Sequence, residues 1–273
     1  MTALRSILLF FAAMAAFAAP ATARGPRDVA YGPEPRQRLD IYLPRAAEKA
    51  PRPRKTLVFI HGGGWTRGHK DRYGFLGRAF ARAGYVVVVT NYRLYPQAAF
   101  PAFVEDAAKA VAWVRANIAG HGGDPERIYL MGHSAGAHIA ALVALDPRYL
   151  RTVKVPRAAI KGMIGLAGPY VFEPKQLARI APIFAAHPHP NARPVVFAGK
   201  GGPPLLLLSA GLDAIVGAKN GPGLAAAHRG AGGQATARSY SGIGHNQVLL
   251  AIAPALSFLA PVRADVVRFI GKP

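Results

Sequence analysis

The chain has 273 residues, of which 51% are apolar and none is cysteine, and it carries a formal net charge of +21. This length and apolar content suffice for one domain with a sizeable core and argue against a disordered chain. The absence of cysteine excludes a disulfide scaffold. The Arg and Lys residues are spread along the chain without a zinc-finger, RNP or basic-helix pattern, so we expect a solvated basic surface and no nucleic-acid partner.

The first 23 residues have the pattern of a secretory signal peptide. Arg5 precedes an apolar run over residues 7–19, and residues 21–23 (ATA) offer small side chains for cleavage after Ala23. A membrane anchor is the alternative, but the run is short for a span and no second apolar segment of about 20 residues follows. We therefore expect a mature protein in the periplasm or outside the cell, with no integral membrane span after cleavage.

Beyond the signal peptide, apolar runs alternate with helical patterns. Residues 24–37 are rich in Pro, Gly and Arg and predict a flexible lead-in, so the folded domain is expected over 38–273. Strands are expected within 38–44, 56–65, 84–96, 127–132, 160–170, 203–211 and 236–240. Helices are expected near 73–83, within 100–120, after residue 134 and over 261–271. The alternation predicts a single α/β domain whose mostly parallel sheet is covered by helices on both faces.

One motif stands between the strand ending at 132 and an Ala-rich helix. Gly132-His133-Ser134-Ala135-Gly136 fits the pattern G-x-S-x-G, which places a serine at a sharp strand-to-helix turn with its hydroxyl exposed. The helix that begins there favours developing negative charge at its N-terminus. Alone the pattern is weak, because a small serine also fits a tight turn. Its setting makes Ser134 a candidate nucleophile.

A second motif, His61-Gly62-Gly63-Gly64-Trp65, directly follows the strand over 56–60. Backbone amides in a glycine loop can point at an oxyanion without obstruction by side chains. We assign the amides of Gly63, Gly64 and Ala135 to an oxyanion hole. A plain tight loop is the alternative; a phosphate loop would need a Lys and a Ser or Thr that are absent. His61 is expected to be a structural hydrogen-bonding residue, whereas Trp65 and His133 are expected to line the substrate cleft.

Two further residues complete a candidate triad. Asp213 follows the apolar run 203–211 by two residues, and His245 lies in a Gly-flanked loop after the last predicted strand. Both are thus placed at the carboxyl edge of the sheet, where an acid can hold an imidazole in the correct tautomer. The chain order Ser134, Asp213, His245 is the nucleophile–acid–histidine order of α/β-hydrolases.

These stretches resemble α/β-hydrolase fold carboxylesterases, near the hormone-sensitive-lipase-like group and the acetyl-xylan and feruloyl esterase-like group. The matching segments include "LDIYLP", "HGGGW", "GHSAGAH", "LLLLSAGLDAIV" and "GIGHNQVL". The chain also resembles arylformamidases, which often carry a bulkier residue at the position of Gly64. The resemblance implies a small cap over a serine hydrolase site, with no metal or cofactor.

The expected function is hydrolysis of carboxylic esters through an acyl-enzyme intermediate. The expected substrates are esters of short acyl groups or carbohydrate-linked esters. The segment 171–202 is too short for a large lid, and export suits a small-molecule or polysaccharide-linked ester. The alternatives are an arylformamidase-type amide hydrolase and, in a different class, a non-catalytic binding member of the fold. The sequence leaves the oligomeric state and the identity of the acyl and alcohol groups open.

Overall fold

A computed structural model of the chain describes most of the domain, and the expected signal peptide over 1–23 lies outside the described part. The structure describes residues 25–44, 53–174, 178–185, 189–199 and 201–271. Within these ranges no helix combines the length and the apolar character that crossing a bilayer requires.

The described residues form one central sheet of eight strands in the order β1-β2-β4-β3-β5-β6-β7-β8. The strands are β1 (Val29–Ala30), β2 (Arg38–Tyr42), β3 (Arg54–Ile60), β4 (Val86–Thr90), β5 (Gly123–His133), β6 (Ile160–Leu166), β7 (Leu205–Ala210) and β8 (Ala235–Tyr240). β2 is antiparallel to both β1 and β4, and every later pairing is parallel. The mostly parallel sheet expected from the sequence is confirmed.

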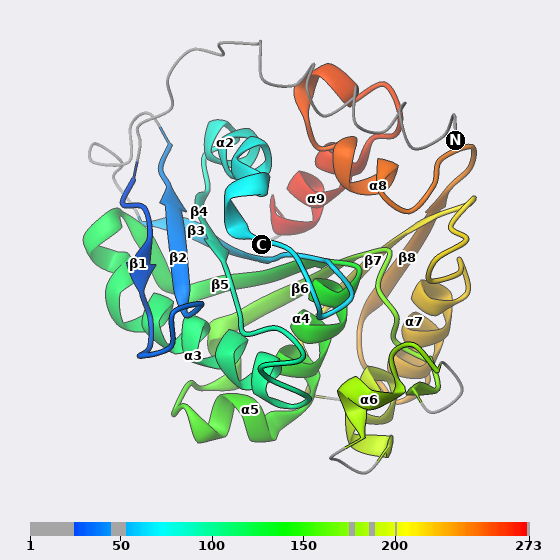
Figure 1. Cartoon of the computed structure of the whole chain (residues 1–273). Coiled ribbons are helices and arrows are strands. Elements are labelled where there is room, and N and C mark those ends of the chain that lie inside the picture. The colour runs from blue at the N-terminus through cyan, green and yellow to red at the C-terminus, as the bar shows by residue number, and fades with distance from the viewer. Residues whose placement is uncertain (1–24, 45–52, 175–177, 186–188, 200, 272–273) are drawn as a thin grey trace, which may run out of the picture.

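Helices cover both faces of the sheet (Figure 1). On one face lie α2 (Gly74–Arg82), α8 (Gln247–Leu250) and α9 (Val262–Gly271), and the other face carries α3 (Ala102–Asn117), α4 (Ala135–Leu145), α5 (Pro147–Thr152) and α7 (Asn220–Gly230). A short helix, α6 (Ala181–Phe184), lies within residues 171–202, and we call the described residues of this segment the cap. The described 3-10 turns are η2 (Lys70–Tyr73), η3 (Ile118–His121), η4 (Arg157–Ala159), η6 (His189–Ala192), η7 (Pro194–Phe197) and η8 (Pro254–Leu256).

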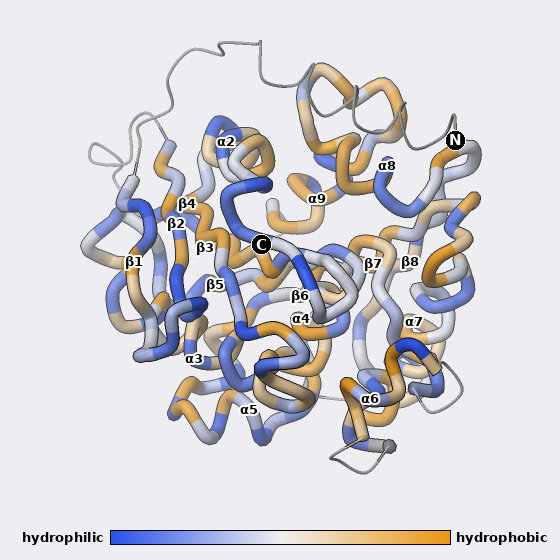
Figure 2. Tube along the Cα trace, in the orientation of Figure 1, coloured by the Kyte–Doolittle hydropathy of each residue, from blue (hydrophilic) through white to orange (hydrophobic). Residues whose placement is uncertain are grey.

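The Val-rich strand β4 shows why the core has two halves. Val86 and Val88 pack into the cluster on the α3/α4 face, whereas Val87 and Val89 pack into the cluster on the α2/α9 face. Successive side chains of a strand point to opposite faces, so a strand covered on both sides is apolar at every position. Figure 2 shows this hydrophobic character along the central strands.

The structure differs from the flexible lead-in expected over 24–37, because the chain from residue 25 onward packs on the sheet. Val29 pairs with Leu39, and the Tyr31 hydroxyl donates a hydrogen bond of 2.7 Å to the carbonyl of Asn91. Gln37 is fully buried, and its amide donates to Asp106 at 2.7 Å. Tertiary pairing overrides the local Pro, Gly and Arg content, because strand formation depends on packing against neighbouring strands more than on local propensity.

Candidate active site

Ser134 stands at the turn between β5 and α4, with backbone angles φ 53° and ψ −124°. A non-glycine residue in this region is strained and persists only where its surroundings impose the conformation. The flanking glycines explain how they do so. A Cβ on Gly132 would clash with the carbonyl of Gly136, and a Cβ on Gly136 would clash with the carbonyl of Ile60 in β3. The G-x-S-x-G pattern therefore lets strand, turn and helix approach closely enough to hold Ser134 in place.

Asp213 and His245 lie on the loops that follow β7 and β8. Nδ1 of His245 lies 2.8 Å from Oδ2 of Asp213, and both side chains are buried, with 7% and 2% of their surfaces exposed. The two loops are joined at the backbone as well, because the amide of Leu212 donates to the carbonyl of Ile243 at 2.9 Å. Residues 32 positions apart in the sequence therefore form one fixed pair.

The Asp213 carboxylate accepts three hydrogen bonds. Its Oδ1 accepts the amides of Ile215 and Val216, each at 2.9 Å, while Oδ2 faces His245. Burial alone would raise the pKa of this carboxyl, but the hydrogen bonds from His245 and the two amides outweigh burial and hold the pKa below its usual value. The ionised form of Asp213 accepts a hydrogen bond from the proton on Nδ1 of His245, which leaves Nε2 free to act as a base.

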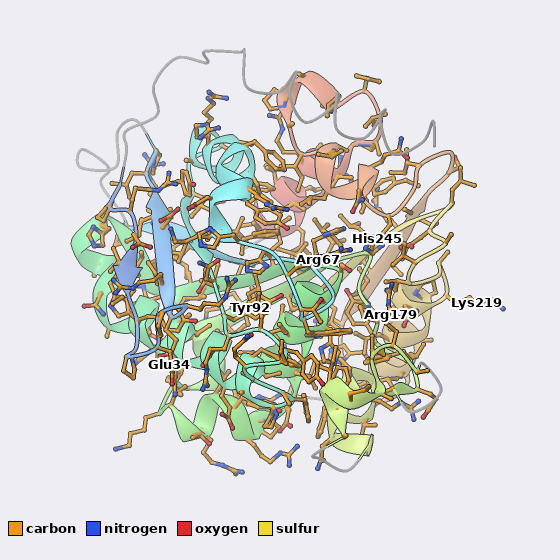
Figure 3. The ribbon with its side chains drawn as sticks, in the orientation of Figure 1. Glu34, Arg67, Tyr92, Arg179, Lys219 and His245 are labelled. Carbon is orange, nitrogen blue, oxygen red and sulfur yellow. The ribbon has the colours of Figure 1, made fainter. Side chains whose placement is uncertain are left out.

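Among the described residues, the Ser134 hydroxyl makes no hydrogen bond. Its proximity to the acid–histidine pair follows from its neighbour His133, whose ring centroid lies 4.8 Å from that of His245. Hydrogen bonds between a nucleophile and its base are often long before substrate binds. The ring contact with His133 therefore brings His245, which is labelled in Figure 3, next to the turn that carries Ser134.

The loop over 61–68, which we call the glycine loop, runs beside the same turn. Gly63 and Gly64 have φ values of 130° and 60°, which only glycine adopts without strain. The carbonyl of Gly63 accepts the amides of Thr66 and Arg67, at 3.2 and 3.1 Å. In the part of the chain that the structure describes, no acceptor is bonded to the amides of Gly63, Gly64 or Ala135. These amides are available to an oxyanion.

His61 begins the glycine loop and is fully buried between two aromatic rings. Its ring stacks on Tyr92 at a centroid distance of 4.4 Å and on Tyr73 at 5.9 Å, and its Nδ1 donates to the carbonyl of Gly62 at 2.8 Å. Burial lowers its pKa to about 3, so the ring is neutral. The structure thus places His61 as a packing and hydrogen-bonding residue of the loop, as its sequence context predicts.

Trp65 and His133 do not line an open cleft, in contrast to the expectation from the sequence. Each is only 4% exposed. The Trp65 indole is enclosed by His138 and by two cap residues, Phe172 and Phe184, at centroid distances of 5.2, 6.0 and 5.1 Å. The indole is buried because packing aromatic rings of the cap against it removes a large apolar surface from water.

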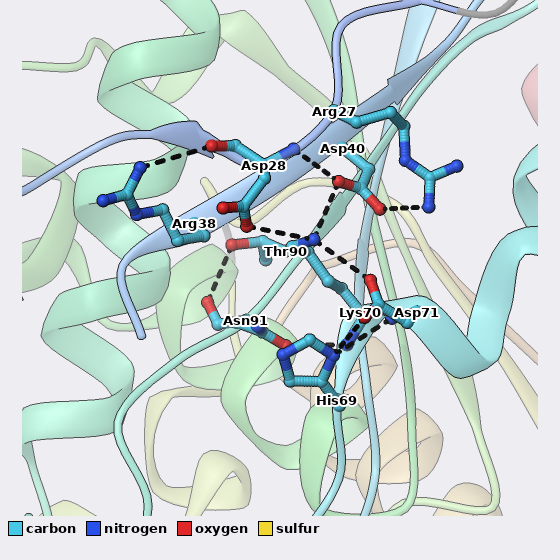
Figure 4. Close-up of polar contacts among 9 residues, drawn as sticks. All are labelled: Arg27, Asp28, Arg38, Asp40, His69, Lys70, Asp71, Thr90 and Asn91. Atoms are coloured by element: carbon cyan, nitrogen blue, oxygen red, sulfur yellow. Dashed lines mark hydrogen bonds and ion pairs between the residues drawn. The ribbon is translucent and has the colours of Figure 1, made fainter. Parts of the chain in front are cut away.

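Just beyond the glycine loop, the buried Lys70 is the centre of an ion cluster (Figure 4). The Lys70 ammonium lies 2.9 Å from Asp40 of β2, 3.2 Å from Asp28 and 3.1 Å from Asp71. The Lys70 amide donates to the side chain of Asn91 at 2.7 Å. The sequence carries no signal for this cluster, because its members come from four separate segments.

Three comparisons place these features among known proteins. The BD-FAE family model matches residues 39–171, a range that holds the glycine loop and Ser134. The probable isoprenylcysteine alpha-carbonyl methylesterase ICME of Oryza sativa subsp. japonica is 39% identical over 151 residues, which cover 54% of this chain and 36% of that protein. Esterase LipC of Mycobacterium tuberculosis is 30% identical over 212 residues, covering 70% and 51%. The chain therefore spans about a third to a half of the length of these curated relatives.

Among solved structures, Thermogutta terrifontis esterase 2 phosphonylated by sarin superposes with a TM-score of 0.74. The match covers 90% of this chain and 96% of that chain at 22% identity. At this identity the likeness establishes the fold, and it extends over nearly the whole of both chains.

Proposed function

Because this chain has the α/β-hydrolase fold, we propose that it is a serine-dependent carboxylic ester hydrolase. The observation that carries the proposal is the 2.8 Å hydrogen bond between His245 and Asp213 beside the turn that carries Ser134. Three groups that a serine hydrolase requires follow strands of the same sheet, although they are distant in the sequence, and this arrangement supports the proposal. Relatives named as esterases support the same reaction class.

In this mechanism Nε2 of His245 accepts the hydroxyl proton of Ser134 as Oγ attacks the ester carbonyl. The amides of Gly63, Gly64 and Ala135 stabilise the oxyanion that forms. His245 then gives the proton to the leaving alcohol, and the acyl group remains on Ser134. Water, deprotonated by His245, attacks the acyl-enzyme and releases the carboxylic acid, while Asp213 stabilises the imidazolium in both half-reactions.

The substrate we propose is an ester of a short acyl group, either a small molecule or carbohydrate-linked. Support comes from the cap, in which Phe172 and Phe184 pack on Trp65 of the glycine loop and fill space beside the oxyanion site with aromatic rings. Support for export comes from the sequence of residues 1–23, and an exported enzyme can reach esters on extracellular polymers. N-terminal sequencing of the exported protein tests this part: a start at Arg24 agrees with it, and an intact Met1 in the cytoplasm contradicts it.

The reaction class is tested by comparing p-nitrophenyl acetate, butyrate and octanoate with an N-formyl aromatic amide, in the wild type and in Ser134→Ala. We expect turnover to be highest for the acetate or butyrate and to disappear in the variant. Preference for the formamide would favour the arylformamidase-type alternative. Absence of turnover on every substrate, together with tight binding of one of them, would favour a non-catalytic binding protein.

A further inference from the structure

His133 contacts three parts of the proposed machinery at once. It precedes Ser134 in the chain, and its Nε2 lies 3.1 Å from the backbone carbonyl of His245, 112 residues away. On its other side lies the glycine loop. A Cβ on Gly62 would stand 3.0 Å from His133 Nδ1, 2.9 Å from the His133 carbonyl and 3.2 Å from Cβ of Ser134. The His133 ring therefore fills the space between the glycine loop and the loop that carries His245.

The direction of the hydrogen bond is fixed by chemistry. A carbonyl oxygen only accepts, so Nε2 of His133 must carry the proton, and the ring must be the Nε2–H tautomer. Burial, together with the neighbouring His245, lowers the pKa of His133 to about 3. A neutral ring at this place donates its hydrogen bond without adding a positive charge next to His245, which itself becomes positive during turnover.

The bond matters because the other hydrogen bonds described for the His245 loop, including that from His245 Nδ1 to Asp213, do not reach the segment that carries Ser134. Gly242 in this loop has φ 74°, and the loop is held by the Leu212 amide on Ile243 and by the Gly244 amide on the Gln247 side chain, at 2.9 and 2.6 Å. Among the described contacts, the hydrogen bond from His133 is the one that ties the backbone of His245 to the segment carrying Ser134.

We propose that His133 is a positioning residue, which fixes the backbone of His245 relative to Ser134 through its Nε2–H bond to the His245 carbonyl. The inference rests on the proposed function, since it assigns a task within that reaction. It replaces the cleft-lining role that the sequence predicts for this side chain. A displacement of about 1 Å between a base and a nucleophile can cost about 100-fold in rate, so loss of the bond should lower kcat more than it raises KM.

The test compares two amides of different reach at position 133. The Nε2 of glutamine can occupy the place of the imidazole Nε2, whereas the side chain of asparagine is one methylene too short. We expect His133→Asn to lower kcat by about 10- to 100-fold with KM within about threefold of wild type, and His133→Gln to recover most of that loss. His133→Leu, which keeps bulk and removes the donor, should resemble His133→Asn.

His228 on helix α7 provides a matched control, because it is also a fully buried histidine that is hydrogen-bonded to a loop backbone. Its Nδ1 accepts the amide of Gly199 at 3.1 Å. His228→Gln and His228→Leu should lower the melting temperature and leave kcat per folded molecule unchanged. If His133→Leu does not fold, the comparison of Gln with Asn decides, with each folded fraction measured by circular dichroism.

Two outcomes contradict the inference: a kcat in His133→Asn equal to wild type, or equal losses in His133→Asn and His133→Gln. The second outcome would mean that ring shape, and not the hydrogen bond, is required. Labelling with a fluorophosphonate separates this result from a failure of the proposed function. If wild type itself is not labelled at Ser134, the proposed function is wrong; if wild type is labelled and the position 133 variants react at the same rate, only the role of His133 is wrong.

Discussion

The Asp213 carboxylate lies 2.8 Å from Nδ1 of His245 and, through its other oxygen, accepts the amides of Ile215 and Val216 at 2.9 Å each. One side chain thus orients the proposed base and holds its own loop in shape. The two tasks are separable, because an amide at this position keeps an oxygen acceptor while losing the charge.

Asp213→Asn should therefore fold and be nearly inactive. The asparagine oxygen can still accept from the loop amides, but the NH2 group that then faces His245 favours the wrong imidazole tautomer. We expect kcat to fall by about 10⁴-fold. The measurement is kcat on p-nitrophenyl acetate with the protein shown to be folded by circular dichroism.

Asp265 provides the control for this change. Its buried carboxylate accepts from the hydroxyl of Tyr240 at 2.6 Å and pairs with Arg238 and Arg268, so its described partners lie on β8 and α9 and do not include His245. Asp265→Asn should lower stability and leave kcat within a few-fold of wild type. If Asp213→Asn is mild and Asp265→Asn severe, the acid of the triad has been misassigned.

Alanine substitutions at two adjacent positions of the glycine loop, Gly63 and Gly64, should have opposite effects on activity. At Gly63 the φ of 130° and a clash with the carbonyl of Arg67 exclude a side chain. At Gly64 the φ is 60°, but the nearest atom to a new Cβ is the Thr66 hydroxyl at 4.0 Å. Gly64→Ala should cost only about 1–2 kcal/mol of stability and retain activity, because its amide is kept.

Gly63→Ala should instead reshape the loop and remove most of the activity. Thermal unfolding together with kcat on p-nitrophenyl acetate distinguishes the two variants. Equal activity in both would show that the loop accepts a side chain at position 63, contrary to the clash with the Arg67 carbonyl.

Buried neutral histidines predict a loss of stability in acid. Burial lowers the pKa of His61 and His133 to about 3 and that of His138 to about 4, against an ordinary value near 6.5. Between these values the unfolded chain binds protons that the folded chain does not. The stability from these groups is therefore complete above about pH 6.5 and falls as the pH drops toward 4 and 3.

Urea unfolding between pH 7.5 and pH 4 measures this dependence. Each such histidine contributes up to about 1.4 kcal/mol per pH unit within its window. His138→Gln, which removes one titrating ring, should flatten the curve below pH 6. A free energy of unfolding that does not change from pH 7.5 to 4.5 would contradict the burial of these neutral rings.

The Lys70 cluster predicts a large stability effect from one substitution. Burial would lower the pKa of Lys70, but Asp40, Asp71 and Asp28 together raise it above its usual value, so the ammonium is charged. Lys70→Met would remove one of the two cations that face the fully buried Asp40, which keeps its pair with Arg27 at 2.8 Å, so we expect a cost of about 3 kcal/mol.

The exposed pair of Arg115 and Glu126 is the control, because exposed ion pairs contribute at most about 1 kcal/mol. Denaturant unfolding compares Lys70→Met with Arg115→Gln. Similar small losses in the two variants would mean that Lys70 is more hydrated than the structure shows.

Local patterns in the sequence were sufficient to predict most of the sheet and the edge at which the site lies. Runs such as the four valines of β4 are apolar at every position because both faces are covered, and this is visible without tertiary information. The two-residue strand β1 and the Gly-containing helix α7 were not predicted. Both are stabilised by packing on neighbouring strands and not by their own propensity.

The site likewise has features that the sequence predicts and features that only the structure shows. The motifs placed Ser134, Asp213 and His245 after the correct strands, because loop positions follow from strand order. The burial of Trp65 under Phe172 and Phe184, and the bond from His133 to the His245 carbonyl, join segments far apart in sequence. No spacing or composition rule reports such contacts.

The most direct test of the central claim is the reactivity of Ser134. Wild type should hydrolyse p-nitrophenyl acetate and be labelled by a fluorophosphonate at Ser134, shown by peptide mass analysis. Ser134→Ala should fold, lose about 10⁴- to 10⁶-fold in kcat and take up no label. Full esterase activity in Ser134→Ala, or a label found on another residue of the wild type, would contradict the account.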